Sequence, residues 1–527
     1  MKIFNKTGNK LKLYADDSLT KKASLNALAV ALDYGASLLV GFIVTPLLLL
    51  GLGRYYFGAW QVLNRLVGYI SPASGRPTQA LKWAVARDQA STDHKQKQNY
   101  VGSAFIVWVL FLPLMIVLGA FLVWMAPSWL KASPEHFLQI RVCTGLLVAN
   151  LALTSLATIP TSVLQGENLG YKRMGLTTTT VLLGGGLVWL AMHFSTGLIG
   201  VAVAALITTF LTGVVFFKVT QSNAKWFKVS FPPFQQTRQF LGLSSWFLGW
   251  NLVMNLMTAS DVVILGFLIS PEAVTDYSLL KYAPETMISL IALLNLGITP
   301  GLGGIIGSGH LKKAANIRGE MMTLTWLVAT ALGATILTWN RPFLNLWVGP
   351  GHYIGSAAGF FITLVVTQFV LIRCDAGIID ISLNLRRKVL MGLLSSLVAI
   401  AISGLLVGYF KFGVVGLCLG MIIGRLLLSV EYPSIVGRFL GVSFSSQLRS
   451  SLRPALITIL LYLSASWLAS HLNLGGRSGL RGWINFVGGA GITAGVFLMV
   501  AFYSGLSGLQ RKTLYRRLRA AKSPRSR

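Results

Sequence analysis

The sequence has few charged residues, and acidic residues are the scarcest of them. Only 11% of the 527 residues are charged, against about a quarter in an ordinary soluble domain. A solvated globular enzyme and a disordered chain are both excluded, because each needs far more polar side chains than this chain has. With 54% apolar residues, most of the chain is predicted to lie in lipid.

Cysteine and histidine are also scarce. The three cysteines, Cys143, Cys374 and Cys418, all lie in apolar stretches, and an odd number of buried thiols is no disulfide framework. The six histidines show no metal-binding spacing. The chain has no Walker loop, no HExxH motif and no dinucleotide fingerprint after a strand. We expect no metal and no other cofactor, and coupling to H⁺ or Na⁺ stays open.

Long apolar runs dominate what is present. Fourteen stretches approach the ~20 residues that a spanning helix needs: 24–50, 55–80, 101–126, 139–163, 174–194, 197–218, 240–269, 273–300, 321–340, 353–380, 389–410, 413–435, 454–471 and 483–506. The second is interrupted by Pro72, Gly75 and Pro77, and broken helices are tolerated at membrane depth where they line a cavity. The sequence predicts an all-α polytopic membrane protein with about fourteen transmembrane helices.

The net charge of +30 is explained by its position along the chain. When the fourteen stretches alternate across the membrane, 32 of the 45 Lys and Arg fall in segments on one side, 6 on the other and 7 within the spans. Basic residues gather on the cytoplasmic side of membrane proteins. We therefore predict a multi-pass protein of the cytoplasmic membrane with both termini cytoplasmic, basic tails over anionic lipids, and no nucleic-acid partner.

An internal repeat of about 216 residues divides the chain. Gly197-Leu-Ile-Gly-Val-Ala matches Gly413-Val-Val-Gly-Leu-Cys, and Gly58 to Arg65 falls on Val274 to Lys281 at the same offset. Six helices are an even number, so the two copies have the same orientation and surround a central cavity. The predicted parts are an N-terminal tail (1–23), an N-lobe (24–220), a cytoplasmic linker (221–239), a C-lobe (240–436), two further helices (437–506) and a C-terminal tail (507–527).

Basic residues inside spans are the main candidates for function, because each costs at least ~2.5 kcal/mol at the bilayer centre. Arg65 and Lys281 occupy equivalent places in the two lobes. Two such cations facing a central cavity suit a diphosphate. The alternative for Lys281 is an ion pair with Glu285, one helical turn further on.

Further candidates lie on the same spans. Tyr69 and Arg76 share a helix face with Arg65 if that helix is continuous. In the C-lobe, Arg373 and Asp380 lie seven residues apart, and Asp375 is expected to neutralise part of that charge. Arg425 is the deepest basic residue of its helix, and Glu431 is a poorly placed partner for it.

Two acidic residues are candidates for ion coupling. Asp33 lies about nine residues into the first span, and Asp261 lies in the outer third of the seventh. A buried carboxylate can titrate near neutral pH, because desolvation raises its pKa. A structural ion pair with an intramembrane arginine is the alternative for both residues.

Several segments resemble the oligosaccharide (polysaccharide) flippases of the superfamily that also holds the multidrug and toxin extrusion transporters. Leu52-Gly-Arg-Tyr-Tyr-Phe-Gly-Ala-Trp resembles that family's "LG…YG.W" segment, and 75–87 its "G…A..R..A" continuation. Asp261-Val-Val-Ile-Leu-Gly with Ala273-Val-Thr-Asp-Tyr-Ser-Leu resembles its "D..ILG…V..Y.L" segment. Leu346-Trp-Val-Gly and Tyr353-Ile-Gly resemble a further one. Arg76 departs from the family pattern, in which an uncharged turn with an acid is common.

The resemblance implies a flippase that moves a polyprenyl diphosphate-linked oligosaccharide by alternating access for polysaccharide export, beside a polysaccharide polymerase and glycosyltransferases. Arg65 and Lys281, with Arg373 and Arg425 behind them, would then line its cationic cavity. A multidrug exporter and a lipid-linked peptidoglycan precursor flippase of the same fold are alternatives. A membrane glycosyltransferase or polymerase is disfavoured, because the predicted outer loops are too short for a catalytic domain.

Overall fold

The computed structural model describes the chain from residue 17 to residue 515, except for 76, 90, 174, 383–384, 472–478, 509 and 513–514. Every regular element in this part is helical. The α-helices are α1 (Asp17–Ile70), α2 (Pro77–Arg87), α3 (His94–Trp129), α4 (Phe137–Ala157), α5 (Ile159–Gly166), α6 (Leu176–His193), α7 (Gly197–Asn223), α8 (Phe234–Leu268), α9 (Pro271–Gly307), α10 (Leu311–Trp347), α11 (Ser356–Ser382), α12 (Leu385–Gly408), α13 (Gly413–Leu440), α14 (Phe444–His471) and α15 (Gly479–Val500).

Twelve segments of the described chain are long and apolar enough to cross a membrane, which confirms a polytopic all-α fold. The count differs from the predicted fourteen for two reasons. The first segment, Leu28–Ser74, contains both of the first two predicted spans, because α1 continues past Gly53, whose φ of 75° breaks the helical backbone. Helix α9 is not among the twelve, because the side chains of 294–301, in its second half, lie outside the described part of the structure.

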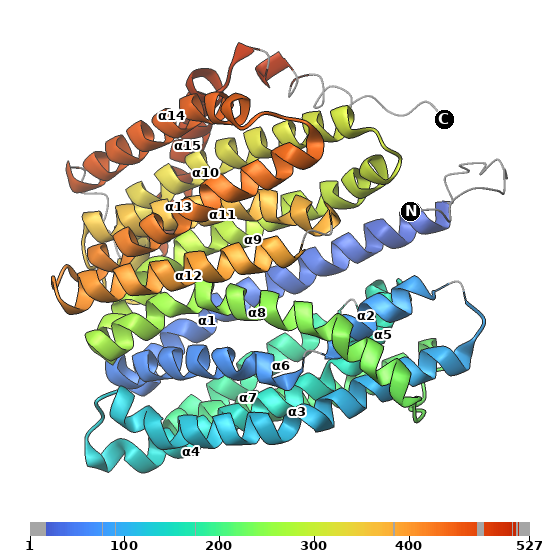
Figure 1. Cartoon of the computed structure of the whole chain (residues 1–527). Coiled ribbons are helices and arrows are strands. Elements are labelled where there is room, and N and C mark those ends of the chain that lie inside the picture. Colours follow the sequence, from blue (N-terminus) through green and yellow to red (C-terminus); the bar gives the residue numbers. More distant parts are fainter. Residues whose placement is uncertain are drawn as a thin grey trace.

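The helices run side by side along one direction and form two halves (Figure 1). In the first half α3 packs on α4, α4 on α7, and α6 on both α1 and α7. In the second half α13 packs on α11 and α12, and α9 to α11 pack on one another. Helix α1 contacts α8 and α9, so it joins the halves, while α14 and α15 pack on α10 at the upper edge.

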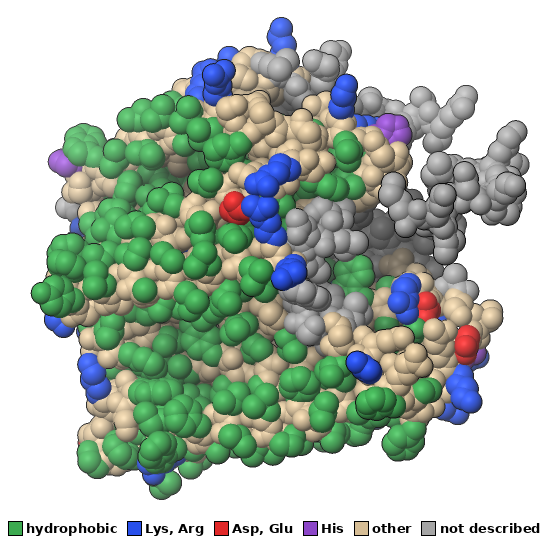
Figure 2. All heavy atoms as spheres, in the orientation of Figure 1, with side chains coloured by type: hydrophobic (Ala, Val, Ile, Leu, Met, Phe, Trp, Pro, Cys, Tyr) green, Lys and Arg blue, Asp and Glu red, His purple; other side chains and the backbone are tan. Residues whose placement is uncertain are grey.

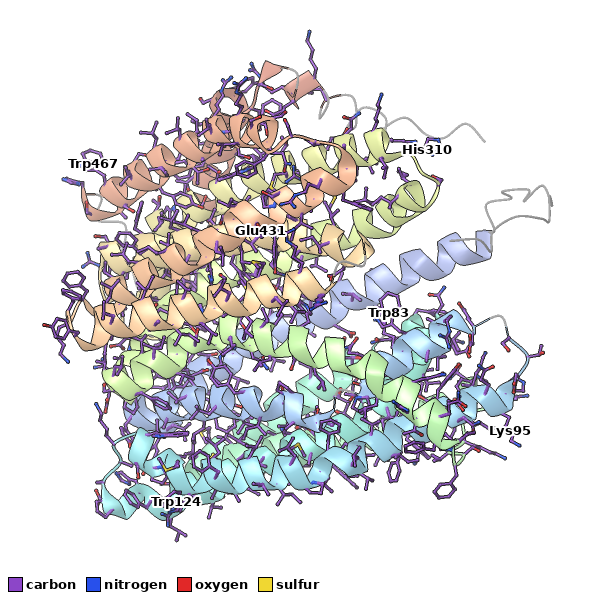
Figure 3. The ribbon with its side chains drawn as sticks, in the orientation of Figure 1. Trp83, Lys95, Trp124, His310, Glu431 and Trp467 are labelled. Carbon is purple, nitrogen blue, oxygen red and sulfur yellow. The ribbon has the colours of Figure 1, made fainter. Side chains whose placement is uncertain are left out.

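The two ends of the bundle differ in the residues that they carry. Lys95 and His310 lie at one end, here called the inner end, and Trp124 and Trp467 lie at the opposite, outer end (Figure 3). A broad apolar surface covers the face shown in Figure 2, with Lys and Arg side chains mainly toward its right-hand side and margins. The alternation of loops predicts that the inner end is cytoplasmic, and this orientation stays a prediction.

The buried apolar residues show how the halves are joined. One cluster at the outer end draws on both halves, from Leu198 of α7 to Leu417 of α13, with Val274 of α9 between them. Toward the inner end the buried residues fall into one cluster around α2, α3 and the start of α8 and another around α10, α11 and α13. The halves are therefore packed together at the outer end and packed separately at the inner end.

Small residues bring α12 and α13 into backbone contact. Gly420 and Gly424, four residues apart on α13, face Ser403 and Ala399 of α12. A Cβ atom at Gly424 would lie 2.4 Å from the Ala399 Cα atom, and one at Gly420 would lie 2.4 Å from the Ser403 N atom. The Ser395 hydroxyl also donates to the Gly424 carbonyl at 2.9 Å. Close packing of small residues is the main source of helix association within lipid.

We expect Gly424→Ala to destabilise the protein by about 1–3 kcal/mol, because its methyl group has no room against the α12 backbone. Gly404→Ala on α12 is the matched control, since a Cβ there meets no atom within 4 Å, and alanine favours a helix over glycine. Thermal unfolding in detergent measures both variants. Equal midpoints would show that this contact does not contribute to stability.

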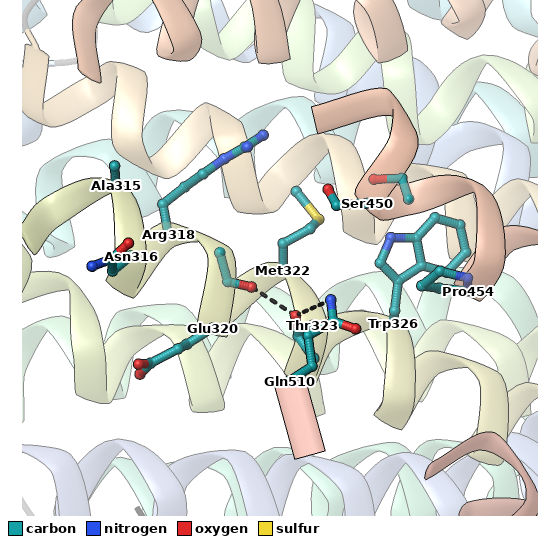
Figure 4. Close-up of a pocket in the computed structure, with 12 residues that line it drawn as sticks. Ala315, Asn316, Arg318, Glu320, Met322, Thr323, Trp326, Ser450, Pro454 and Gln510 are labelled. Atoms are coloured by element: carbon teal, nitrogen blue, oxygen red, sulfur yellow. Dashed lines mark hydrogen bonds between the residues drawn. The ribbon is translucent and has the colours of Figure 1, made fainter. Parts of the chain in front are cut away.

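Helix α14 and the segment after α15 enclose a pocket of about 470 Å³ against α10 (Figure 4). Trp326 and Pro454 lie on one side of it. The Gln510 amide donates to the Thr323 hydroxyl at 3.2 Å, and that hydroxyl donates to the Gly319 carbonyl at 2.8 Å. The bond from Gln510 attaches the C-terminal segment to α10.

Candidate functional site

A fully buried carboxylate lies at the centre of a charged network where α8 meets α9. The Asp261 side chain has 0% exposed surface, and its Oδ2 atom accepts hydrogen bonds from Lys281 Nζ at 2.5 Å and from the Tyr277 hydroxyl at 2.7 Å. The backbone N–H of Val262 donates to Oδ1 at 2.8 Å. Tyr277 and Lys281 are four residues apart, so one face of α9 presents both donors. The buried charge is thereby compensated.

The network continues through Glu285 to α1. Lys281 Nζ lies 2.8 Å from Glu285 Oε1, which is the predicted ion pair one turn along the helix. Arg65 Nη2 lies 4.0 Å from the same oxygen. Glu285 thus stands between the two cations that the repeat relates. The side chains of Arg65 and Glu285 are 35% and 39% exposed, whereas that of Lys281 is 8% exposed.

The repeat explains how Arg65 and Lys281 come together. The segments 58–65 and 274–281, which the 216-residue offset relates, lie on α1 and α9, and these two helices pack against each other. The two cations approach the same carboxylate from opposite halves. The sequence predicted that they are equivalent, but not that two acidic residues share Lys281.

Arg425 and Tyr69 flank this network. Arg425 of α13 is buried and donates to the backbone carbonyl oxygens of Met257 and Val365, and its guanidinium lies 5.2 Å from the centre of the Phe369 ring. Met257 is one turn before Asp261 on α8, which places Arg425 behind the network. Tyr69 lies one turn beyond Arg65 and packs, partly buried, against the apolar core.

The expectation that Asp375 neutralises part of the charge of Arg373 is wrong. Asp375 does not pair with Arg373; it accepts two hydrogen bonds from the buried Arg318, Nε to Oδ1 at 2.9 Å and Nη2 to Oδ2 at 2.8 Å. Asp380 pairs with Lys388 at 2.6 Å. Arg373 itself is exposed and points a nitrogen toward the Met254 sulfur, 3.4 Å away. Partners came from neighbouring helices, because tertiary packing overrides spacing along one helix.

The structure confirms that Glu431 is a poor partner for Arg425. Glu431 pairs with Arg387 rather than with Arg425. Arg318, Arg387 and Lys388 lie just before the predicted spans 321–340 and 389–410, whereas α10 and α12 begin before these residues. Lys388 is buried, and its ammonium lies 3.7 Å from the centre of the Trp250 ring. An acid in an apolar span, such as Asp375, needs a cation nearby. This requirement is the feature of the sequence from which the role of Arg318 could have been predicted.

Asp33, the other candidate for ion coupling, takes part in a separate contact. Asp33 of α1 accepts a hydrogen bond from the Thr178 hydroxyl of α6 at 3.5 Å, which ties together two helices of the first half. Arg76 lies outside the described residues. Within the described ranges no group of three or more His, Cys, Asp or Glu is placed to hold a metal ion.

A second set of contacts closes the two halves at the outer end. Arg54 Nη2 of α1 lies 2.5 Å from Asp276 Oδ2 of α9, and His352, from the loop after α10, lies 2.9 Å from Asp276 Oδ1. The Thr275 hydroxyl donates to the Arg54 carbonyl at 2.6 Å. Gly58 lies directly against the start of α9: a Cβ atom there would lie 1.8 Å from the Pro271 carbonyl oxygen.

Solved structures with the same arrangement are found among membrane transporters. The lipid II flippase MurJ in an inward closed conformation aligns with a TM-score of 0.64 at 15% identity, over 90% of this chain and 98% of MurJ. The eukaryotic MATE transporter AtDTX14 aligns with a TM-score of 0.61 at 16% identity, over 85% of this chain and 98% of its own. An inward-facing multidrug resistance MATE transporter of the MOP superfamily aligns with a TM-score of 0.60 at 14% identity, over 79% of this chain and 99% of its own.

The chain has the MATE-like fold. No protein-family model and no curated protein sequence matches it. This fold confirms the multi-pass, all-helical architecture that the apolar stretches predict. A shared fold does not assign a substrate, which must be argued from the charged network.

Proposed function

We propose that the protein is a flippase for a polyprenyl diphosphate-linked oligosaccharide, acting in the cytoplasmic membrane by alternating access. The observation that carries the proposal is the convergence of Arg65 and Lys281, one from each half, on the single carboxylate of Glu285. A site shared by two halves can change when the halves rock against each other.

The charges favour an anionic substrate. Glu285 is an internal anion held between two cations, and a diphosphate presents the same kind of charge with more acceptor oxygens. Arg65 is exposed enough to exchange Glu285 for a phosphate group, and its planar fork of donors suits phosphate oxygens. Asp261 stays paired with Lys281, so substrate binding would replace Glu285 and leave the buried pair intact.

An apolar pocket beside the network suits the lipid part of such a substrate. About 580 Å³ of space lies between α1, α9, α10 and α15, lined by side chains that include Phe42, Tyr282, Trp339 and Phe486. Tyr282 directly follows Lys281 on α9, so the pocket and the charges lie along the same helix. A polyprenyl diphosphate needs this combination of an apolar surface and fixed cations.

A lipid-linked peptidoglycan precursor is the second candidate substrate, because the aligned MurJ structure is a lipid II flippase and the charge argument applies equally to it. A cationic drug is disfavoured, because the described acids of the network, Asp261 and Glu285, are both paired with cations. Polysaccharide polymerases and glycosyltransferases acting on the same lipid-linked sugar are the proposed partners.

We expect Arg65→Gln to lower the flipping rate by about 10- to 100-fold, the equivalent of one charge-assisted hydrogen bond. Arg65→Lys keeps the charge but loses the fork, and is expected to retain part of the activity. Purified protein in liposomes is tested with a fluorescent polyprenyl diphosphate-linked oligosaccharide and, in parallel, with a lipid-linked peptidoglycan precursor.

Arg449→Gln is the matched control, because it removes the same charge from an exposed position on α14. It is expected to flip normally. If Arg65→Gln also flips both lipids at the normal rate, the diphosphate site is not at Arg65 and the proposal fails. Flipping of the peptidoglycan precursor alone would select the second candidate.

A further inference from the structure

A polar pocket of about 620 Å³ lies at the inner end of the first half, away from the charged network. It is enclosed by α2, α3 and the first turns of α8, and Lys95, at its rim, marks this end of the molecule in Figure 3. Its lining contains five amide side chains: Gln96, Asn99, Gln235, Gln236 and Gln239. Nothing in the transport of a diphosphate or of a lipid tail uses these amides.

The charges in this pocket are already compensated. Arg87 donates to the Tyr100 hydroxyl at 2.9 Å and to Asp88 at 3.3 Å, and the Tyr100 hydroxyl donates to Asp88 at 2.7 Å. The hydrogen bond to Tyr100 raises the pKa of Arg87, which keeps its charge in place. Asp93 and Lys95, also in the lining, carry opposite charges, and the Asp93 side chain accepts a hydrogen bond from the Gln96 backbone N–H at 3.0 Å. A neutral, hydrogen-bonding ligand therefore fits this pocket better than an ion.

The amides supply the chemistry that binds hydroxyl groups. Each Asn or Gln side chain offers two N–H donors and a carbonyl acceptor, so neighbouring amides can pair with adjacent hydroxyls that both donate and accept. Gln236 and Gln239, three residues apart on the first turns of α8, lie on one side of that helix. The Asn99 Oδ1 atom is buried and has no hydrogen-bond partner among the described residues.

We propose that this pocket binds neutral sugar residues of the lipid-linked oligosaccharide on the side where the substrate is loaded. The inference rests on the proposed function and adds a second binding site to it. About 33 Å of helix separates Gln239 from Asp261 on α8, at 1.5 Å per residue. The pocket is therefore a receiving site for the glycan, distinct from the site for the diphosphate.

The experiment measures glycan binding without the lipid. The full-length protein, purified in lipid nanodiscs, is titrated by calorimetry with the glycan released by mild acid from the polyprenyl diphosphate pool of the host. The unmodified protein is expected to bind this glycan. Gln236→Ala combined with Gln239→Ala is expected to weaken that binding by about tenfold or more, the equivalent of two neutral hydrogen bonds.

Gln221→Ala is the matched control, because it removes an exposed amide at the end of α7, outside the pocket. The double variant and the control are expected to unfold at the same temperature as the unmodified protein. Glycan binding that is undetectable in the unmodified protein, or unchanged in the double variant, would overturn the proposal.

Arg65→Gln separates this inference from the proposed function, since it is expected to lower the flipping rate but leaves the pocket untouched. Glycan binding that persists in Arg65→Gln supports two distinct sites. Glycan binding that is lost in Arg65→Gln places the sugar at the charged network and overturns the pocket. Normal flipping by Arg65→Gln, with glycan binding still sensitive to Gln236 and Gln239, refutes the diphosphate site alone.

Discussion

Replacing Lys281 by methionine is expected to destabilise the protein by about 3–5 kcal/mol, the cost of leaving a buried charge without its partner. Asp261 has no exposed surface, so solvent cannot take the place of the lost ammonium. Methionine keeps most of the volume of the lysine side chain, which limits the effect to the charge. We expect poor expression and a much lower unfolding temperature in detergent.

If the unpaired charge of Asp261 causes the loss of stability in Lys281→Met, a second substitution that removes this charge restores the stability. Asp261→Asn combined with Lys281→Met removes both charges and keeps an acceptor for the Tyr277 hydroxyl, so most of the lost stability is expected to return. Glu285→Gln is the matched single variant. Its side chain is 39% exposed, and it is expected to change stability by less than about 1 kcal/mol.

The double variant also separates the two roles of Lys281. A folded double variant that no longer flips the lipid-linked substrate means that the ammonium contributes to binding as well as to stability. If the double variant flips normally, Lys281 is only a structural counter-ion, and Arg65 is the functional cation. If Lys281→Met alone has the same unfolding temperature as the unmodified protein, the Asp261–Lys281 pair does not stabilise the fold as its geometry indicates.

The sequence predicted the site only in part, and Lys281 shows where the limit lies. The repeat placed it opposite Arg65, and the i to i+4 spacing predicted its pair with Glu285, which the structure confirms. Its stronger partner, Asp261, lies twenty residues earlier on another helix. Local spacing cannot reveal such a pair, because it depends on how α8 packs against α9.

The same limit applies to helix ends. Apolar length predicted the spanning stretches well, since the requirement for a bilayer is nearly independent of tertiary structure. It missed the polar first turns of α10 and α12, where Arg318 and Lys388 are buried beside Asp375 and Asp380. Charged residues at helix ends look like loop residues in a hydropathy pattern. That Arg318 and Lys388 are buried among helices follows only from how the helices of the second half pack together.

Adding a side chain at Gly58 is expected to cause a large loss of stability and of flipping. Its Cα atom lies so close to the start of α9 that a Cβ atom would overlap the Pro271 carbonyl oxygen at 1.8 Å. That oxygen belongs to the backbone and cannot rotate away. The same region carries the Arg54–Asp276 ion pair and the bond from Thr275 to the Arg54 carbonyl. Separating α1 from α9 there breaks the outer contacts together.

We expect Gly58→Val to cost about 3 kcal/mol or more and to abolish flipping, because alternating access needs an outer end that can close. Gly58→Ala is the milder variant, and Gly68→Val is the control on the same helix, where a Cβ meets no atom within 4 Å. A cysteine introduced by Thr275→Cys reports on the seal, since Thr275 has no exposed surface. It is expected to react with a membrane-impermeant thiol reagent faster in the Gly58 variants than in the Gly68→Val control. Equal labelling rates, with flipping intact, would show that the outer end closes without this contact.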